Sequence, residues 1–80
     1  MKLGGYDVEF AHVSKRGVTM ANVVVDGRAY TGIAECSRLD NFSRISGRKI
    51  ALAEALKRAG LPKVERTHVW EDYKVTVRYE

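Results

Sequence analysis

Four basic residues crowd a short stretch in the middle of the chain and could together hold an anion. Arg38, Arg44, Arg48 and Lys49 fall at a polar corner and at the expected start of a helix. Backbone N–H groups at a helix N-terminus carry partial positive charge, so cationic side chains beside them can help to bind a phosphate or a carboxylate. A solvated helix face accounts for the same residues equally well. Cations at this end of a helix oppose the macrodipole, and that small cost favours a binding role.

A second basic group and one tryptophan offer further contacts with a partner. The second group lies at the other end of the expected helix and consists of Lys57, Arg58, Lys63 and Arg66. Trp70 is flanked by polar residues, which favours an exposed position on a strand, where it could anchor an interface or stack on a base. We therefore predict a partner-binding or phosphate-binding site at Arg38, Arg44, Arg48, Lys49 and Trp70.

Covalent and metal chemistry have few candidate residues. Cys36 with His12 or His68 is the only possible nucleophile–base pair, but Cys36 lies in an expected strand of small and apolar residues, which favours a place in the core. The two histidines are isolated, so no cluster has the spacing of a zinc site. The chain also lacks a phosphate-binding loop, a dinucleotide fingerprint and a nucleophile elbow. We predict a non-enzymatic protein with no cofactor and no metal.

The composition is that of one small globular domain. The chain has 80 residues, of which 45% are hydrophobic and 30% are charged, and its formal net charge is +4. This size predicts a single domain over residues 1–80 with a thin core. The positive charge favours an acidic partner, either nucleic acid or an acidic protein surface. With one cysteine and no apolar signal segment, the chain is predicted to be cytoplasmic, with no membrane partner.

The hydropathy pattern predicts a sheet that positions these residues. Tyr6–Val13 alternates, Val18–Val25 is rich in valine, and Asp26-Gly27 is typical of a two-residue hairpin turn that leads into a strand over Arg28–Cys36. The last segment also alternates, as one strand over 73–79 and a second over 64–70. We predict an α+β fold of four to five antiparallel strands with one helix packed on one face, in the order β-β-β-α-β(-β).

The helix between these strands has two possible starts. It either runs unbroken from Asn41, or a short turn at 41–45 leads into a main helix over 46–59, and we favour the second. Gly47 makes a kink plausible at that point, because glycine is unfavourable inside a helix. Gly60, followed by Pro62, predicts the helix end.

One motif resembles a pattern found in small uncharacterised proteins of phages and prophages. In those proteins G-x-A-x-C, D-x-F and G-x-x-x-A follow a hairpin and lead into a helix. Here they are matched by Gly32-Ile-Ala-Glu-Cys36, Asp40-Asn-Phe42 and Gly47-Arg-Lys-Ile-Ala51. The resemblance covers about a quarter of the chain and implies a mobile-element origin, which includes inhibitors of host defence such as anti-CRISPRs. The same residues also suit packing, since Gly32, Ala34 and Cys36 would keep a strand slim where a helix crosses it.

A second stretch is similar to the last part of a double-stranded-RNA-binding domain. It runs from Ser46 to Leu56 after a hairpin, and the resemblance implies that Arg48 and Lys49 contact phosphates. The chain departs from that family because no helix precedes the first strand, Gly47 replaces a usual lysine, and a strand is expected to follow the helix.

Three functional hypotheses follow. The first is a phage-type binding protein that inhibits a host nucleic-acid-handling defence complex by occupying its surface, with a host protein or ribonucleoprotein complex as partner. The second is a module that binds nucleic acid directly through the basic cluster. The third, a thiol enzyme at Cys36, has the least support. A homodimer formed through an unpaired edge strand is compatible with each of them.

Overall fold

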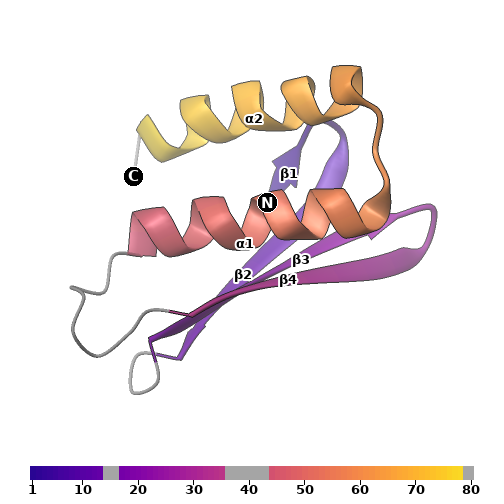
Figure 1. Ribbon diagram of the computed structural model, residues 1–80. Coiled ribbons are helices and arrows are strands. Elements are labelled where there is room, and N and C mark those ends of the chain that lie inside the picture. The colour runs from indigo at the N-terminus through magenta and orange to yellow at the C-terminus, as the bar shows by residue number, and fades with distance from the viewer. Residues whose placement is uncertain (14–16, 36–43, 79–80) are drawn as a thin grey trace.

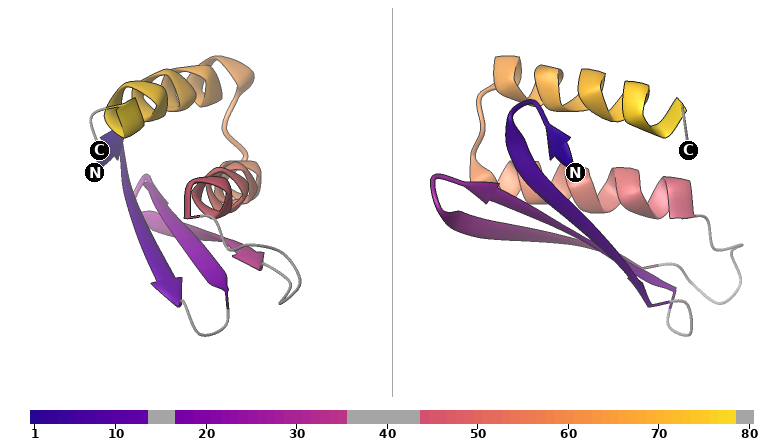
Figure 2. Two further views of the ribbon diagram at one scale, coloured as in Figure 1. Left: turned by 90° about the vertical axis from the view of Figure 1, so that its left-hand side faces the viewer. Right: turned by 180° about the vertical axis from the view of Figure 1, so that it is seen from behind.

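The computed structural model, which describes residues 1–13, 17–35 and 44–78, is an α+β fold with a four-stranded antiparallel sheet and two helices. The elements are β1 (Lys2–Leu3), β2 (Tyr6–Val13), β3 (Val18–Val25), β4 (Arg28–Glu35), α1 (Arg44–Ala59) and α2 (Lys63–Arg78). Both helices lie on the same side of the sheet and run in opposite directions, with α1 over β3 and β4 and α2 beside β1 (Figures 1 and 2).

The three long strands agree with the prediction from the sequence. In the sheet order β1-β2-β3-β4, Val8 pairs with Val23, and Val23 pairs with Tyr30. The backbone φ angles of Asp26 and Gly27 are 51° and 78°, and two positive angles in a two-residue loop define the type I′ turn that Asp-Gly favours. The hairpin expected at this dipeptide is therefore confirmed.

Helix α1 begins at Arg44 and is continuous to Ala59, so no kink separates a turn from a main helix at Gly47. Gly47 is buried, and a Cβ there would lie 2.5 Å from Oγ1 of Thr19 on β3. Glycine at this position permits close packing instead of bending. Gly60 has a φ of 68° and donates its N–H to the carbonyl of Lys57 at 3.1 Å, which ends the helix as predicted.

The prediction of strands at the end of the chain is wrong, because Lys63–Arg78 forms the single helix α2. The alternation of Tyr73 and Val75 suggested a strand, but a helix places Val69 and Tyr73 four residues apart on one face, and both are buried. Packing on that face overrides the strand preference of the β-branched residues. The observed order is therefore ββββαα, and the fourth strand is the short N-terminal β1 instead of a C-terminal strand.

Helix α2 is attached to the start of the sheet. The Tyr6 hydroxyl donates to Oε2 of Glu65 at 2.6 Å, and the Gly4 N–H donates to Oδ2 of Asp72 at 2.7 Å. A Cβ at Gly4 would lie 2.8 Å from Cγ2 of Val69, so this turn also passes unusually close to the helix. These contacts join residues about sixty positions apart in the sequence and fix where α2 lies.

The core lies between the sheet and the two helices. A Cβ at Gly32 would overlap the carbonyl oxygen of Ala51, which confirms the expectation that small residues let a helix cross β4. Cys36, Asp40 and Phe42, which belong to the same motif, lie outside the described residues. The buried apolar residues are Leu3, Val8, Ala21, Val23, Ala34, Ala51, Leu52, Ala55, Leu56, Leu61, Val69 and Tyr73.

Candidate functional site

The predicted basic cluster is only partly described by the structure. Arg38 lies outside the described residues, and Arg44 is the first residue of α1, with a side chain that is not described. Arg48 and Lys49 both lie in the second turn of α1. Their side chains diverge, because Arg48 is half-buried towards the sheet whereas Lys49 is exposed.

Arg48 has a structural role on the sheet side of α1. Its Nε donates to Nε2 of His12 at 3.3 Å, and its guanidinium carbon lies 5.6 Å from the centre of the Phe10 ring, a cation–π distance. Because arginine can only donate, Nε2 of His12 accepts and the ring proton sits on Nδ1. Nδ1 therefore donates to Oγ1 of buried Thr19, which lies 3.0 Å away.

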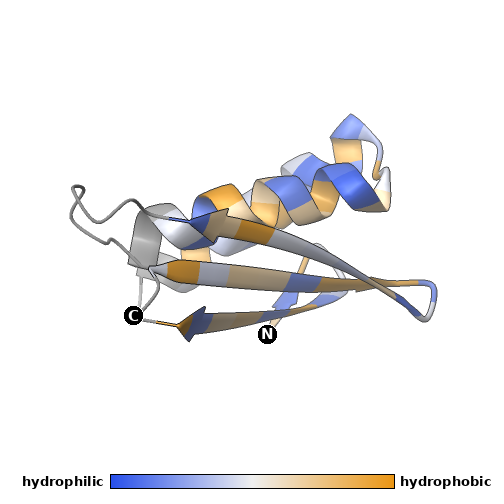
Figure 3. Cartoon of the chain, turned by 60° about the horizontal axis from the view of Figure 1, so that its bottom comes forward, coloured by the Kyte–Doolittle hydropathy of each residue, from blue (hydrophilic) through white to orange (hydrophobic). Residues whose placement is uncertain are grey.

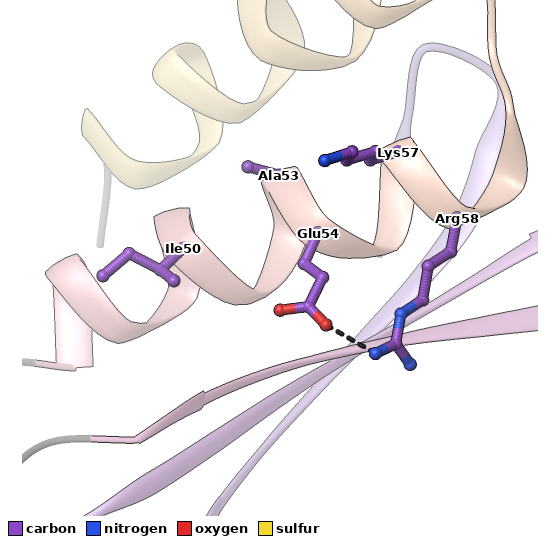
Figure 4. A pocket seen from close by; sticks show the side chains of 5 residues that line it. All are labelled: Ile50, Ala53, Glu54, Lys57 and Arg58. Carbon is purple, nitrogen blue, oxygen red and sulfur yellow. Dashed lines mark ion pairs between the residues drawn. The ribbon is translucent and has the colours of Figure 1, made fainter.

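Lys49 instead belongs to the outer side of α1. Lys49, Ala53 and Lys57 are spaced four residues apart, so they form one exposed row along the helix, with Ile50 beside it. Ile50, Ala53, Glu54, Lys57 and Arg58 line a shallow hollow on this surface (Figure 4). The outer side of α1 thus offers cations at both ends of the row and small or apolar side chains between them.

Arg58 is held in place by two contacts at the last turn of α1. Its Nη2 pairs with Oε1 of Glu54 at 2.6 Å, as Figure 4 shows, and its Nη1 donates to the carbonyl of Thr31 at 3.0 Å. Thr31 lies on β4, the edge strand of the sheet. The guanidinium thus takes up a carbonyl that another strand could otherwise use, and this makes the β4 edge a poorer template for pairing with a second chain.

The second basic group comes together where the two helices meet. Lys57 and Arg58 end α1, Lys63 and Arg66 begin α2, and all four are exposed. Only Gly60, Leu61 and Pro62 separate the two helices. Together with Lys49 they define the basic face, which consists of Lys49, Lys57, Arg58, Lys63 and Arg66.

The opposite side of the molecule has a different character, which was not predicted from the sequence. The residues that alternate away from the helices form the open face of β2, β3 and β4. Figure 3 shows these strands in front of the helices. Twelve residues make up this face: Asp7, Glu9, Ala11, Val13, Val18, Met20, Asn22, Val24, Ala29, Thr31, Ile33 and Glu35. Three of them are acidic and none is basic. The strand alternation contains this signal, but it can be read only once the pairing register is known.

One row of the open face carries paired polar groups. Glu9, Asn22 and Thr31 are cross-strand neighbours, and the Thr31 hydroxyl donates to Oδ1 of Asn22 at 3.0 Å. The next row is apolar and consists of Ala11, Met20 and Ile33, the last of which is 41% exposed. The open face is therefore acidic and partly apolar.

Trp70 and the two histidines do not meet in one place. Trp70 is half-buried in α2, not on a strand, and packs edge-on to Tyr73 with ring centres 5.6 Å apart. His68 is on α2, with Nδ1 3.9 Å from Oε2 of Glu71, whereas His12 lies beneath α1. Within residues 1–13, 17–35 and 44–78, no three His, Cys, Asp or Glu side chains are grouped as metal ligands.

Comparison with known proteins gives no relative from which a function could be transferred. No protein-family model, no curated protein and no solved structure matches this chain. Neither of the described helices has the length and apolar character needed to cross a membrane.

Proposed function

We propose that this protein is a non-enzymatic binding protein that engages nucleic acid through its basic face. The observation that carries the proposal is the separation of charge between the two sides of the molecule. The two helices carry the exposed cations Lys49, Lys57, Arg58, Lys63 and Arg66, whereas the open face of β2–β4 contains three carboxylates and no basic residue. A phosphate backbone would be attracted to the first surface and repelled by the second.

The exposed cations suit the repeating phosphates of a nucleic-acid backbone better than one isolated small anion. Lys49 and Lys57 stand on the same exposed side of α1, and Lys63 and Arg66 are exposed at the start of α2, just after the end of α1. They are spread over a surface instead of converging on one point. Such an arrangement matches a repeating anion, and most contacts between proteins and DNA are to phosphate and sugar.

Binding to a labelled oligonucleotide, measured by fluorescence anisotropy across a salt titration, tests the proposal. We expect binding at about 50 mM salt that weakens steeply as the salt concentration rises, because counterions are released from the nucleic acid. Lys57→Glu should lower the magnitude of the salt slope by about one or more, since a phosphate contact is lost. Lys2→Glu is the matched control, because Lys2 is exposed on β1, whose Asp7 partner belongs to the open face. Equal effects of the two changes, or no binding at low salt, would contradict the proposal.

The phage-type inhibitor suggested by the sequence resemblance is a second candidate, favoured by the open face of the sheet. Met20 and Ile33 are apolar neighbours there, and Glu9 and Glu35 add negative charge. An acidic and apolar surface suits a protein partner with basic and apolar side chains, and the centre of such interfaces is typically apolar. In this case the protein would occlude a surface of a host defence complex.

Pull-down from a bacterial host lysate after nuclease treatment separates the two candidates. The inhibitor hypothesis expects a specific protein to be retained, and it expects Ile33→Lys to abolish that capture while Lys57→Glu leaves it unchanged. Capture that depends on Lys57 and disappears with nuclease would instead support binding to nucleic acid.

A further inference from the structure

The basic face has two cationic ends and a neutral middle. This arrangement favours duplex over single-stranded nucleic acid. Resting on the proposed function, we infer that α1 lies across a groove of a double helix and contacts the phosphate rows on both sides. The first end is Lys49, and the second end is formed by Lys57 with Lys63 and Arg66 of α2. The inference names duplex nucleic acid, bound through its backbone, as the ligand class.

The spacing of the two ends agrees with a groove width. Lys49 and Lys57 are eight residues apart in a continuous helix, which separates them by about 12 Å along the axis at 1.5 Å per residue. The major groove of B-form DNA is about 12 Å wide. Flexible lysine side chains can adjust this distance by several ångströms, so each end can contact one phosphate row.

The middle of the row contributes no positive charge that could grip a phosphate. Ile50 and Ala53 are uncharged, and Glu54 is paired with Arg58 at 2.6 Å. A single strand that followed α1 along its length would meet this neutral stretch at its centre. A duplex that crosses α1 places its phosphates at the two ends and leaves the groove over the middle.

The burial of the aromatic residues also favours a duplex as the ligand. Proteins that bind single strands typically stack bases on exposed aromatic rings. Among the side chains that the structure describes, the aromatic residues are buried or half-buried, and Phe10, Trp70 and Tyr73 pack together or against the core. The basic face therefore provides charge for a backbone without a stacking platform.

Anisotropy titrations with a short duplex DNA and with one of its strands alone test the inference at equal ionic strength. The full chain is compared with Lys49→Glu, Lys57→Glu and the control Lys2→Glu. These lysines are exposed, and circular dichroism verifies that each variant is folded. We expect the duplex to bind about tenfold more tightly than the single strand, and each α1 variant to lose most of that preference, because a cation that contacts one phosphate row is replaced by a carboxylate that repels it. Lys2→Glu should keep the preference.

Two different results would overturn the inference. If the single strand binds as tightly as the duplex and Lys57→Glu weakens both equally, α1 binds nucleic acid without bridging a groove, and the proposed function survives. If neither oligonucleotide binds at low salt, the proposed function fails and the inference fails with it.

Discussion

Arg48 and Lys49 show how two adjacent basic residues can have separate roles. Arg48 donates to His12 and lies over Phe10, whereas Lys49 is exposed on the outer side of α1. We expect Arg48→Ala to lower the free energy of unfolding by about 1 kcal/mol, because it removes a hydrogen bond and a cation–π contact. Lys49→Ala should change stability by less than about 0.5 kcal/mol but weaken nucleic-acid binding.

Urea denaturation and anisotropy of the two variants measure both effects. A result in which Lys49→Ala costs as much stability as Arg48→Ala would show that the two side chains are not divided in this way.

Tyr6 makes the attachment of α2 sensitive to alkaline pH. Its hydrogen bond to Glu65, desolvation and the nearby negative charges of Glu65 and Asp26 raise the pKa of Tyr6 above its ordinary value of 10.0. A raised pKa means that the folded state favours the protonated phenol. The resulting stabilisation is complete below the ordinary pKa and is lost as the pH rises through the higher pKa of the folded state.

Comparison of the chain with Tyr6→Phe isolates this effect from the other tyrosines. We expect the variant to be less stable than the unchanged chain near pH 8, and the difference to shrink above about pH 10, where tyrosine ionises. Urea denaturation at several pH values measures it. A stability difference that stays constant across this range would show that the Tyr6–Glu65 bond does not contribute.

At the scale of elements, the approach of α1 to β4 depends on Gly32. A Cβ at this position would overlap the backbone carbonyl of Ala51, and because the backbone fixes the position of a Cβ as well, neither group can turn aside. We expect Gly32→Ala to cost about 3 kcal/mol or more, measured by urea denaturation. Gly27→Ala is the control, because it has a φ of 78° but no neighbouring atom within 4 Å, and it should cost only about 1–2 kcal/mol. Equal losses would mean that α1 can move away from β4 at no cost.

The turn before β2 gives a matched test of how α2 is docked. Gly4 and Gly5 both have positive φ angles, of 58° and 87°, but only Gly4 lies against Val69. We expect Gly4→Ala to increase hydrogen exchange of the α2 amides far more than Gly5→Ala, because α2 must shift to make room. The same exchange in both variants would indicate that backbone strain, not contact with α2, dominates.

The elements also show what the sequence could and could not predict. The alternation of Tyr6–Val13, the valine run of β3 and Asp26-Gly27 are local signals, and the structure agrees with all three. Helix α2 was missed because its β-branched residues favour a strand locally. The helix is stabilised by contacts with residues far away in the chain. Gly4 contacts Val69 and Asp72, and Tyr6 bonds to Glu65. No local pattern contains such a contact.

At the scale of the whole molecule, charge is divided between two sides. The helical layer carries the basic face, and the open face of the sheet carries Asp7, Glu9 and Glu35. The sequence predicts the positive α1, but the acidic face depends on the pairing register, because only the register brings Glu9, Asn22 and Thr31 into one row. The basic face therefore differs from the predicted cluster: Arg48 faces the sheet, and the other members beside Lys49 are Lys57, Arg58, Lys63 and Arg66.

The division of charge between the two sides predicts how salt changes the effect of a charge reversal on duplex affinity. Attraction to the basic face and repulsion from the open face both decline as salt screens exposed charges. We therefore expect the difference in affinity between Lys57→Glu and Lys2→Glu to shrink as salt rises from about 50 to 200 mM. A difference that is independent of salt would point to a conformational effect of Lys57→Glu instead of the loss of an electrostatic contact.

The most direct test is to observe which side of the molecule meets the ligand. An NMR titration of the isotope-labelled protein with a short duplex DNA reports this through the amide chemical shifts of every described element. We expect the shifts to change along α1 from Lys49 to Arg58 and at the start of α2, with little change at Glu9, Met20 and Ile33. Changes concentrated on the open face of the sheet, with α1 unaffected, would contradict the account.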